Sequence, residues 1–336
     1  MMFFQERRTQ PRIFTFLLLR KETCGVFVIL MFMSENFAGK LLERNRVGAL
    51  LRIFANKPES VDMVVASGLS ALRRLLSLRT EGRPTFARID FLVSSDPAFD
   101  DTDCGLMAVR LRKEVAEQFP QSAVNILEIK RGDIYCMLLN YGIVNQLEDR
   151  VPYSLILSHN AASYATEENV DALLTAMYHK ARVAGVAIKE IAPLVERGMI
   201  ADTFSIWHNK SLMTVGGFDL IAAKPSRDQA HEHKMLSGWS EEKALRHGDG
   251  KVEFHAAGCE EIIPLIRFTK YFGRSIAVIK PQGEDLKWEE FDEKIDSVAY
   301  HRHLAKLATK EMRMQHLAAT QGVTLEFIRE GIIKPP

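Results

Sequence analysis

The chain has 336 residues, of which 47% are hydrophobic, so it is long enough to bury a sizeable core. Its 44 basic and 43 acidic residues leave a formal charge of +1, which excludes a global field that would attract nucleic acid or an anionic membrane. Four cysteines without CxxC spacing give no disulfide framework and no zinc-finger pattern, and they predict reduced thiols in a cytoplasmic protein.

Residues 1–33 form an apolar N-terminal extension. Its run 13–33 is apolar except for Arg20-Lys21-Glu22, and these charges would lie near the bilayer centre of a spanning helix. The extension therefore predicts no firm membrane span, although a peripheral membrane association stays open. No small-x-small cleavage site follows residues 13–19, which argues against a signal peptide. Two interpretations remain: a native extension, or a native start at Met33 after an over-extended reading frame.

From residue 47 the apolar pattern alternates between strand-like and helix-like segments. This alternation predicts an α/β fold with a mostly parallel, Rossmann-like sheet and helices on both faces. Short apolar runs bounded by turn residues predict strands, and apolar residues at helical spacing predict helices. We expect strands at residues 47–54, 86–93, 123–129 and 153–157, and helices at 60–78, 104–119, 133–147 and 168–183.

Two motifs follow in the second half of the chain. An extended apolar stretch at 201–207 leads to the turn Gly216-Gly217-Phe218-Asp219. Further on, Gly258-Cys259-Glu260-Glu261 opens a predicted helix that stops at Gly273, before a strand at 275–279. The α/β domain is thus expected at 34–284. The apolar stripe of the remaining tail, 285–336, predicts a packing helix pair or a contact between copies in a homo-oligomer.

These motifs, together with the order of strands and loops before them, resemble the family 2-like, A-type glycosyltransferases, which have the nucleotide-diphospho-sugar transferase fold. The resemblance spans roughly residues 47–280. It implies a hexosyltransferase type of activity, in which a sugar passes from a nucleotide-sugar donor to an unknown acceptor with inversion. It also implies that a nucleotide-sugar is the principal ligand, with no nucleic acid partner.

The resemblance implies a donor site in the loops at the carboxyl ends of the first four strands, where open sheets of this kind bind ligands. Asn56 stands where the first strand meets the nucleoside, and Asp96 stands where a carboxylate accepts from the base. Taken singly, Asp96 before Pro97 also fits a turn residue, and Asn140 fits a helix interior. The expected donor-binding residues are Asn56, Asp96, Arg131, Asn140, Ser158, His159 and Asn160.

Metal-dependent members of the family carry Asp-x-Asp after the fourth strand, where two carboxylates hold Mn²⁺ or Mg²⁺ against the diphosphate. Here that segment is Ser158-His159-Asn160, and both carboxylates are missing. Neutral oxygens hold a hard cation far more weakly, so a divalent metal with His159 and Asn160 as ligands stays open as a hypothesis. His231-Glu232-His233 is a second histidine-rich segment that fits either a metal shell or a solvated loop.

Inverting transfer needs a carboxylate that takes the proton of the acceptor hydroxyl. The resemblance assigns this role to Glu261, with Glu260 beside it, although acids at a helix N-terminus also simply favour the positive end of its dipole. Trp207 is expected to stack on a sugar and Asp219 to accept from sugar hydroxyls. Gly216 and Gly217 let the acceptor approach the backbone. The alternative for this turn is a core aromatic and a capping carboxylate.

Two rival functions remain. The missing Asp-x-Asp favours a catalytically silent member of the same fold that binds nucleotide or glycan. Nucleotidyl transfer on a related sheet would release pyrophosphate from a nucleoside triphosphate. The chain has no Gly-x-Gly-x-x-Gly, Walker loop or Ser-x-Gly elbow, so dinucleotide enzymes, P-loop NTPases and serine hydrolases have little support.

Overall fold

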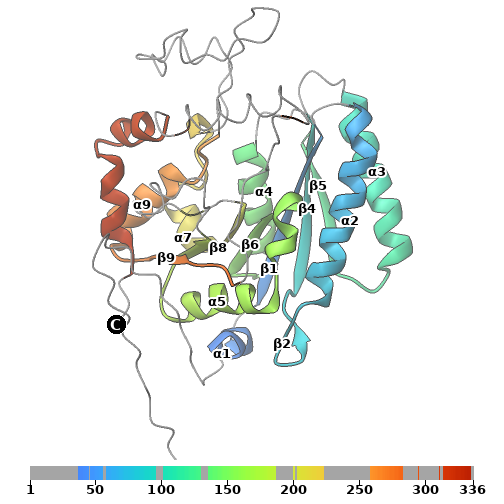
Figure 1. Ribbon diagram of the computed structural model, residues 1–336, viewed down its shortest axis with the longest axis horizontal. Coiled ribbons are helices and arrows are strands. Elements are labelled where there is room, and N and C mark those ends of the chain that lie inside the picture. Colours follow the sequence, from blue (N-terminus) through green and yellow to red (C-terminus); the bar gives the residue numbers. More distant parts are fainter. Residues whose placement is uncertain are drawn as a thin grey trace, which may run out of the picture.

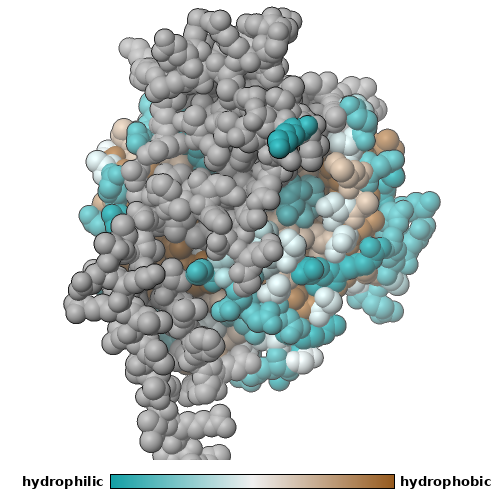
Figure 2. Space-filling view, in the orientation of Figure 1, coloured by the Kyte–Doolittle hydropathy of each residue, from teal (hydrophilic) through white to brown (hydrophobic). Residues whose placement is uncertain are grey.

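The computed structural model describes residues 37–44, 46–55, 58–95, 101–129, 135–186, 200, 203–222, 258–282, 294, 310 and 313–333. The N-terminal extension 1–33 lies outside these ranges. Among the described residues, no helix has the length and apolar character needed to cross a bilayer. Hydrophilic and hydrophobic side chains are mixed on the surface of the α2 and α3 side of the molecule (Figure 2).

A seven-stranded sheet organises the chain, in the order β5-β4-β1-β6-β8-β7-β9. Every strand runs parallel to β1 except β8, which is antiparallel to both β6 and β7. This confirms the prediction of a mostly parallel α/β sheet. The strands are β1 Val47–Ala55, β4 Arg88–Ser95, β5 Val124–Glu128, β6 Tyr153–Ser158, β7 Val183–Val186, β8 Phe204–His208 and β9 Ile276–Ile279, beside a small hairpin of β2 Arg79–Thr80 and β3 Arg83–Pro84.

Helices cover both faces of this sheet (Figure 1). Gly68 of α2 packs against Ile53, whereas Gly142 of α4 packs against Leu50. Side chains alternate along a strand, so α2 and α4 lie on opposite faces of β1. The helices are α1 Phe37–Arg44, α2 Val61–Ser77, α3 Asp101–Gln118, α4 Tyr135–Glu148, α5 Glu167–Tyr178, α7 Asn209–Thr214 and α9 Ile262–Phe272, with 3₁₀ turns η1 Pro58–Ser60, η2 His159–Tyr164, η4 Leu220–Ala222 and η6 Leu325–Gly331.

The central strand β1 explains why this part of the sequence was predictable. Leu50, Leu51 and Ile53 have no exposed surface, because helices cover the strand on both sides. A strand buried on two faces needs a nearly continuous apolar run, which is what residues 47–55 provide. Arg52 is the one charged side chain in that run.

One predicted helix boundary is wrong. A helix was expected at 168–183, but α5 ends at Tyr178 and Val183 already begins β7. Lys180 adopts a positive φ of 78° and turns the chain back toward the sheet. Glycine normally takes that conformation, so the sequence carried no ordinary helix stop signal here. Val183 and Ala184 are fully buried between β8 and β9.

The described part of the predicted C-terminal tail packs into the same core as the sheet. Residues 313–320 are helical, and Met314 and Leu317 are fully buried. The backbone N–H of Ile333 donates to Ile276 O at 2.8 Å, which places Ile333 alongside β9. The segment therefore stabilises the late half of the fold, and its role in self-association stays a prediction.

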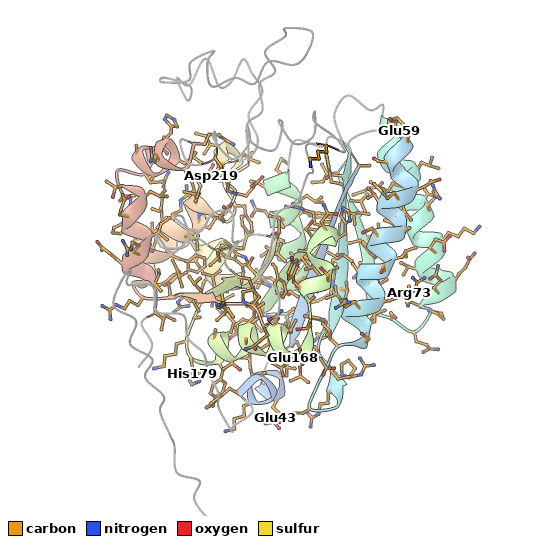
Figure 3. The ribbon with its side chains drawn as sticks, in the orientation of Figure 1. Glu43, Glu59, Arg73, Glu168, His179 and Asp219 are labelled. Carbon is orange, nitrogen blue, oxygen red and sulfur yellow. The ribbon has the colours of Figure 1, made fainter. Side chains whose placement is uncertain are left out.

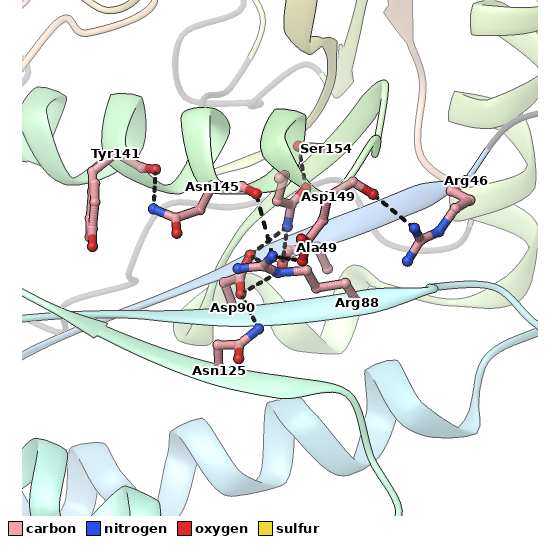
Figure 4. Close-up of polar contacts among 10 residues, drawn as sticks. Arg46, Ala49, Arg88, Asp90, Asn125, Tyr141, Asn145, Asp149 and Ser154 are labelled. Carbon is pink, nitrogen blue, oxygen red and sulfur yellow. Dashed lines mark hydrogen bonds and ion pairs between the residues drawn. The ribbon is translucent and has the colours of Figure 1, made fainter.

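A buried polar network links the amino-terminal part of β4 to α4 (Figure 4). Asp90 has no exposed surface, and its carboxylate accepts from Arg88 Nε at 2.8 Å, Asn125 Nδ2 at 2.9 Å and Gln146 Nε2 at 3.0 Å. Gln146 also accepts from the Ser154 hydroxyl. The hydrogen bonds from Arg88, Asn125 and Gln146 each compensate part of the cost of burying the Asp90 carboxylate.

Candidate functional site

The strand order reverses beside β1. The chain passes from β1 to β4 and β5 on one side, and then returns to place β6 on the other side. Such a switch point leaves a crevice at the carboxyl ends of the strands, where open α/β sheets bind ligands. Figure 3 shows these carboxyl ends at the top of the view, where Glu59 follows β1. Glu43, Glu168 and His179 lie at the opposite, lower edge.

The segment Ser158-His159-Asn160 lies at this switch point. Ser158 is buried at the end of β6 and is paired in register with Arg52 of β1. His159 begins η2, and its Nδ1 lies 2.9 Å from the Ser67 hydroxyl of α2. Asn160 is exposed. These three predicted donor-site residues thus lie beside Arg52 of β1, which the sequence analysis did not single out.

The imidazole of His159 is electrically neutral at pH 7. Burial, and then the nearby Arg52 guanidinium, lower the pKa of His159 to about 4. Its Nδ1 is held by Ser67, so the ring has a fixed orientation. A neutral ring can donate one hydrogen bond and accept one.

Acidification is expected to destabilise the protein through His159. Because the folded-state pKa lies below the ordinary value, the unfolded chain binds more protons between about pH 6.5 and pH 4. The free energy of unfolding should therefore fall with pH across this window, by about 1–2 kcal/mol from pH 7 to pH 5 for this group. Urea unfolding of the wild type and of His159→Asn at pH 7 and at pH 5 measures this fall in the free energy of unfolding.

In that experiment His159→Asn should lose less stability on acidification than the wild type. Asp171, whose pKa burial raises to about 6, acts in the opposite sense, but it is present in both proteins and cancels in the comparison. Equal losses in the two proteins would contradict the prediction.

The Gly216-Gly217-Phe218-Asp219 turn is fixed by α4. Gly216 and Gly217 have φ values of 96° and 68°, which strongly favour glycine. Asn140 Nδ2 donates to Phe218 O at 2.8 Å, and its Oδ1 accepts from Phe218 N at 2.8 Å. A Cβ on Gly217 would lie 2.5 Å from Asn140 Oδ1. The amide that was predicted to bind the donor is therefore engaged in shaping the predicted acceptor turn.

Replacing Asn140 with Ala is expected to lower the free energy of unfolding by about 1–3 kcal/mol, because two backbone groups of Phe218 lose their partner. Asn145→Ala on the same helix is the matched control, since its Nδ2 bonds only an exposed carbonyl of Tyr141. The control should change stability by about 0.5 kcal/mol or less in urea unfolding. A similar loss in both variants would contradict a specific role of Asn140 in the turn.

Asp219 is tied to α9. Its Oδ2 accepts from Arg267 Nη2 at 2.7 Å, and its Oδ1 accepts from Ile221 N at 3.3 Å. Arg267 Nη1 also donates to Val215 O at 3.2 Å. The Asp219 side chain is 30% exposed, so it remains reachable from solvent while it holds the turn against α9.

Trp207 does not fit its predicted role. Its indole has no exposed surface, and it packs against Phe218 and Phe268 with ring centroids 5.2 and 5.7 Å away. Its Nε1 donates to the Ser205 hydroxyl at 2.8 Å. The ring is part of the core and presents no face on which a sugar could stack, which corrects the acceptor-binding expectation for this residue.

The start of α9 carries a cluster of charges. We call it the α9-start cluster, and it comprises Cys259, Glu260, Glu261, Lys310 and Arg313. Glu261 is 1% exposed, and its Oε1 lies 3.3 Å from Lys310 Nζ. Glu260 is partly exposed, and its carboxylate lies over Gly258, where a Cβ would come within 2.3 Å of it. The two predicted catalytic acids thus have different environments.

The cations of this cluster come from the C-terminal segment. Lys310 and Arg313 are both buried, and burial lowers the pKa of Arg313 from its ordinary value. Burial also raises the pKa of the Cys259 thiol to about 12, so this cysteine is not a nucleophile at neutral pH. The sequence signal for the cations is a basic pair three residues apart beside the apolar Met314 and Leu317.

The remaining predicted site residues lie outside the described residues. They are Asn56, Asp96 and Arg131 of the donor site, and the His231-Glu232-His233 segment. Their contribution stays a prediction.

The described residues at the switch point offer few ligands for a divalent metal. Over the ranges that the structure describes, no three His, Cys, Asp or Glu side chains are grouped so that they could hold a metal ion. The local donors are a hydroxyl, a neutral imidazole and an amide, with the Arg52 guanidinium nearby. Hard cations prefer carboxylate oxygens, so this set does not fit Mn²⁺ or Mg²⁺.

No family model and no curated protein matches the chain. Several solved structures are similar to it at a distance. A mannosyl-3-phosphoglycerate synthase from Rubrobacter xylanophilus is 11% identical with a TM-score of 0.43, over 87% of this chain and 80% of the other.

Two further structures show a similar level of likeness. A mannosyltransferase from Pyrobaculum calidifontis, in complex with GDP-Man and Mn²⁺, is 13% identical with a TM-score of 0.37, over 86% and 82% of the two chains. A glucosyl-3-phosphoglycerate synthase from Mycobacterium tuberculosis, in complex with phosphoglyceric acid, is 10% identical with a TM-score of 0.43, over 93% and 90%.

Proposed function

We propose that this chain is a glycosyltransferase of the hexosyltransferase type, which transfers a sugar from a nucleotide-sugar donor to an acceptor with inversion. The observation that carries the proposal is the shared edge of the sheet. The switch-point residues Ser158 and His159 follow β6 at this edge. Since β9 runs parallel to β7, the preceding helix α9 begins toward the same edge, with Glu260 and Glu261 at its start.

The two acids of the α9-start cluster suit different tasks. A general base must reach the hydroxyl whose proton it removes. Glu260 is partly exposed, whereas Glu261 is buried against Lys310. We therefore propose Glu260 as the base that contacts the acceptor, and Glu261 as the residue that fixes the start of α9 through its ion pair.

The acceptor side of the proposed site is built by the turn 216–219. Gly216 carries no side chain to cover its backbone, and this glycine is exposed. Asp219 lies beside it, partly exposed and oriented by Arg267. A sugar or other polyhydroxyl acceptor placed here meets a carboxylate that can accept its hydroxyl hydrogens.

A panel of UDP-, GDP- and dTDP-sugars tests the proposal. Thermal unfolding in the presence of each sugar nucleotide measures binding, and release of free nucleoside diphosphate with an acceptor mixture measures transfer. Both signals are expected from at least one donor. Failure of every donor to raise the unfolding temperature would overturn the proposal.

A catalytically silent binder is the second candidate, and one observation favours it. The segment after β6 supplies neutral groups where the resembled family has two carboxylates. Such a protein would be stabilised by a nucleotide-sugar without releasing nucleotide. Pyrophosphate release from a nucleoside triphosphate would instead support nucleotidyl transfer.

A further inference from the structure

We propose that the amino-terminal edge of the sheet carries a binding site for a phosphate group, built by Arg182, His208 and Lys210. This edge is opposite to the one that holds Ser158 at the end of β6, so the site is separate from the proposed donor and acceptor sites. The phosphate site goes beyond the proposed function and does not depend on it.

The strand pairing brings these residues to one edge. Tyr153 is the first residue of β6 and is paired in register with His208, the last residue of the antiparallel β8. The backbone N–H of His208 donates to Arg182 O at 2.8 Å, and Arg182 directly precedes β7. Parallel strands begin at the edge opposite to their carboxyl ends, so these residues lie away from the switch point. His179, three residues before Arg182, marks this lower edge in Figure 3.

Arg182 is held in place without a carboxylate. Its Nη1 donates to Ser211 Oγ at 2.7 Å, and its guanidinium lies over the Phe272 ring, 4.2 Å from the centroid. Over the part of the chain that the structure describes, no acid forms an ion pair with Arg182 or Lys210. A half-buried guanidinium that is oriented but not neutralised suits an oxyanion, because its planar fork of N–H groups can bind two oxygens at once.

Ser211 also fixes the tautomer of His208. Ser211 N donates to His208 Nδ1 at 3.3 Å, and Ser211 Oγ lies 2.6 Å from the same atom. A backbone N–H can only donate, so Nδ1 is an acceptor and the proton of the neutral ring is on Nε2. Burial, and then the charges of Arg182 and Lys210, lower the pKa of His208, which keeps the ring neutral at pH 7. His208 is only partly buried, and no described residue accepts from Nε2, which leaves this donor for a ligand.

The charges at this edge match those of a phosphate group. Lys210 is exposed and lies two residues after His208. Apart from burial, the groups that shift the pKa values of His208 and Tyr153 are Arg182 and Lys210, and both are cations. A phosphate monoester carries about 1.5–2 negative charges at pH 7, so two cations can neutralise it. A nucleic acid would need a broader basic face, which a net charge of +1 does not favour.

Isothermal titration of the full chain with inorganic phosphate, at constant ionic strength, tests the inference. The wild type is expected to bind phosphate with a dissociation constant of about 1 mM or below. Arg182→Gln should weaken this binding by about tenfold or more, because charged hydrogen bonds to the phosphate oxygens are lost. Lys210→Gln removes one exposed charge and should weaken it by about threefold.

The matched control is Arg73→Gln. Arg73 is an arginine of α2 that bonds Gln118, and its guanidinium also lies over an aromatic ring, that of Phe119. This variant should bind phosphate like the wild type.

A second arm distinguishes a soluble phosphate compound from a lipid headgroup. The wild type and Arg182→Gln are sedimented with phosphatidylcholine vesicles that contain or lack phosphatidic acid. Retention by phosphatidic acid that Arg182→Gln loses assigns the site to a lipid, and phosphate binding in solution without such retention assigns it to a soluble compound.

Two results contradict the inference. One is the absence of binding in both arms, and the other is wild-type behaviour of Arg182→Gln in the arm that shows binding. If Arg182→Gln does not fold, Lys210→Gln takes its place in both arms, because the Lys210 side chain is exposed and its replacement leaves the core intact.

Discussion

Replacing Glu260 with Gln is expected to lower the rate of sugar transfer by about 10²–10⁴-fold, the usual contribution of a general base. The amide keeps the size of the side chain but cannot take the acceptor proton. Glu260 is the partly exposed acid of the α9-start cluster, so the fold of the protein should tolerate the change. Single-turnover transfer with the best donor is the measurement, with nucleotide affinity and the unfolding temperature recorded in parallel.

Two comparisons make this prediction specific. Glu117→Gln, an exposed acid of α3, should retain wild-type transfer. Glu261→Gln removes the buried partner of Lys310 and should lower the unfolding temperature, which separates a structural loss from a chemical one. Full transfer by Glu260→Gln, combined with loss of transfer in a folded Glu261→Gln protein, would show that Glu261 and not Glu260 is the general base.

Replacing Asp90 with Leu is expected to lower the free energy of unfolding by about 3–5 kcal/mol. The substitution keeps the number and branching of the side-chain heavy atoms but leaves the Arg88 guanidinium without its buried counter-charge and Asn125 Nδ2 without its acceptor. It also removes one of the two acceptors of Gln146 Nε2, which keeps Ala49 O. Arg88 keeps its ion pair with Asp149, whose side chain is 56% exposed and therefore compensates only in part. Urea unfolding measures the loss.

The double variant Arg88→Met/Asp90→Leu gives the matched control. Removing both charges eliminates the uncompensated cation, so it should be more stable than Asp90→Leu alone. Asp62→Ala, which breaks an exposed ion pair with Arg110, should cost about 1 kcal/mol or less. A double variant less stable than Asp90→Leu would contradict the electrostatic explanation.

The early part of the fold was predictable because its strands are buried on both faces. Such strands need nearly unbroken apolar runs, and the expected strand at 47–54 corresponds to Val47–Ala55. The strand at 183–186 was not predictable in the same way. Its small residues follow a helix that ends at a non-glycine residue with positive φ, and its pairing partners are distant in sequence.

The environments of the candidate site residues depend on contacts that local patterns do not contain. The resemblance drew attention to Glu260 and Glu261, but it did not indicate that Glu261 is buried beside Lys310, about fifty residues further on, while Glu260 is partly exposed. Trp207 was predicted to meet a sugar, whereas Phe218 and Phe268 enclose it. The position of Arg52 at the β1–β6 pairing carries a local signal, because it is the single charge in an otherwise apolar strand.

The antiparallel strand β8 has a consequence for how the protein is made. β7 pairs only with β8 and β9, and both are synthesised after it. The ribosome must add some ninety residues between Val186 and Ile276, which takes about 5–20 s at ordinary rates of translation. β8, Phe204–His208, is made early in that interval and can cover the β6 edge, whereas the β7 edge stays unpaired until Ile276–Ile279 is made, and this edge is where a chaperone would find an unpaired strand.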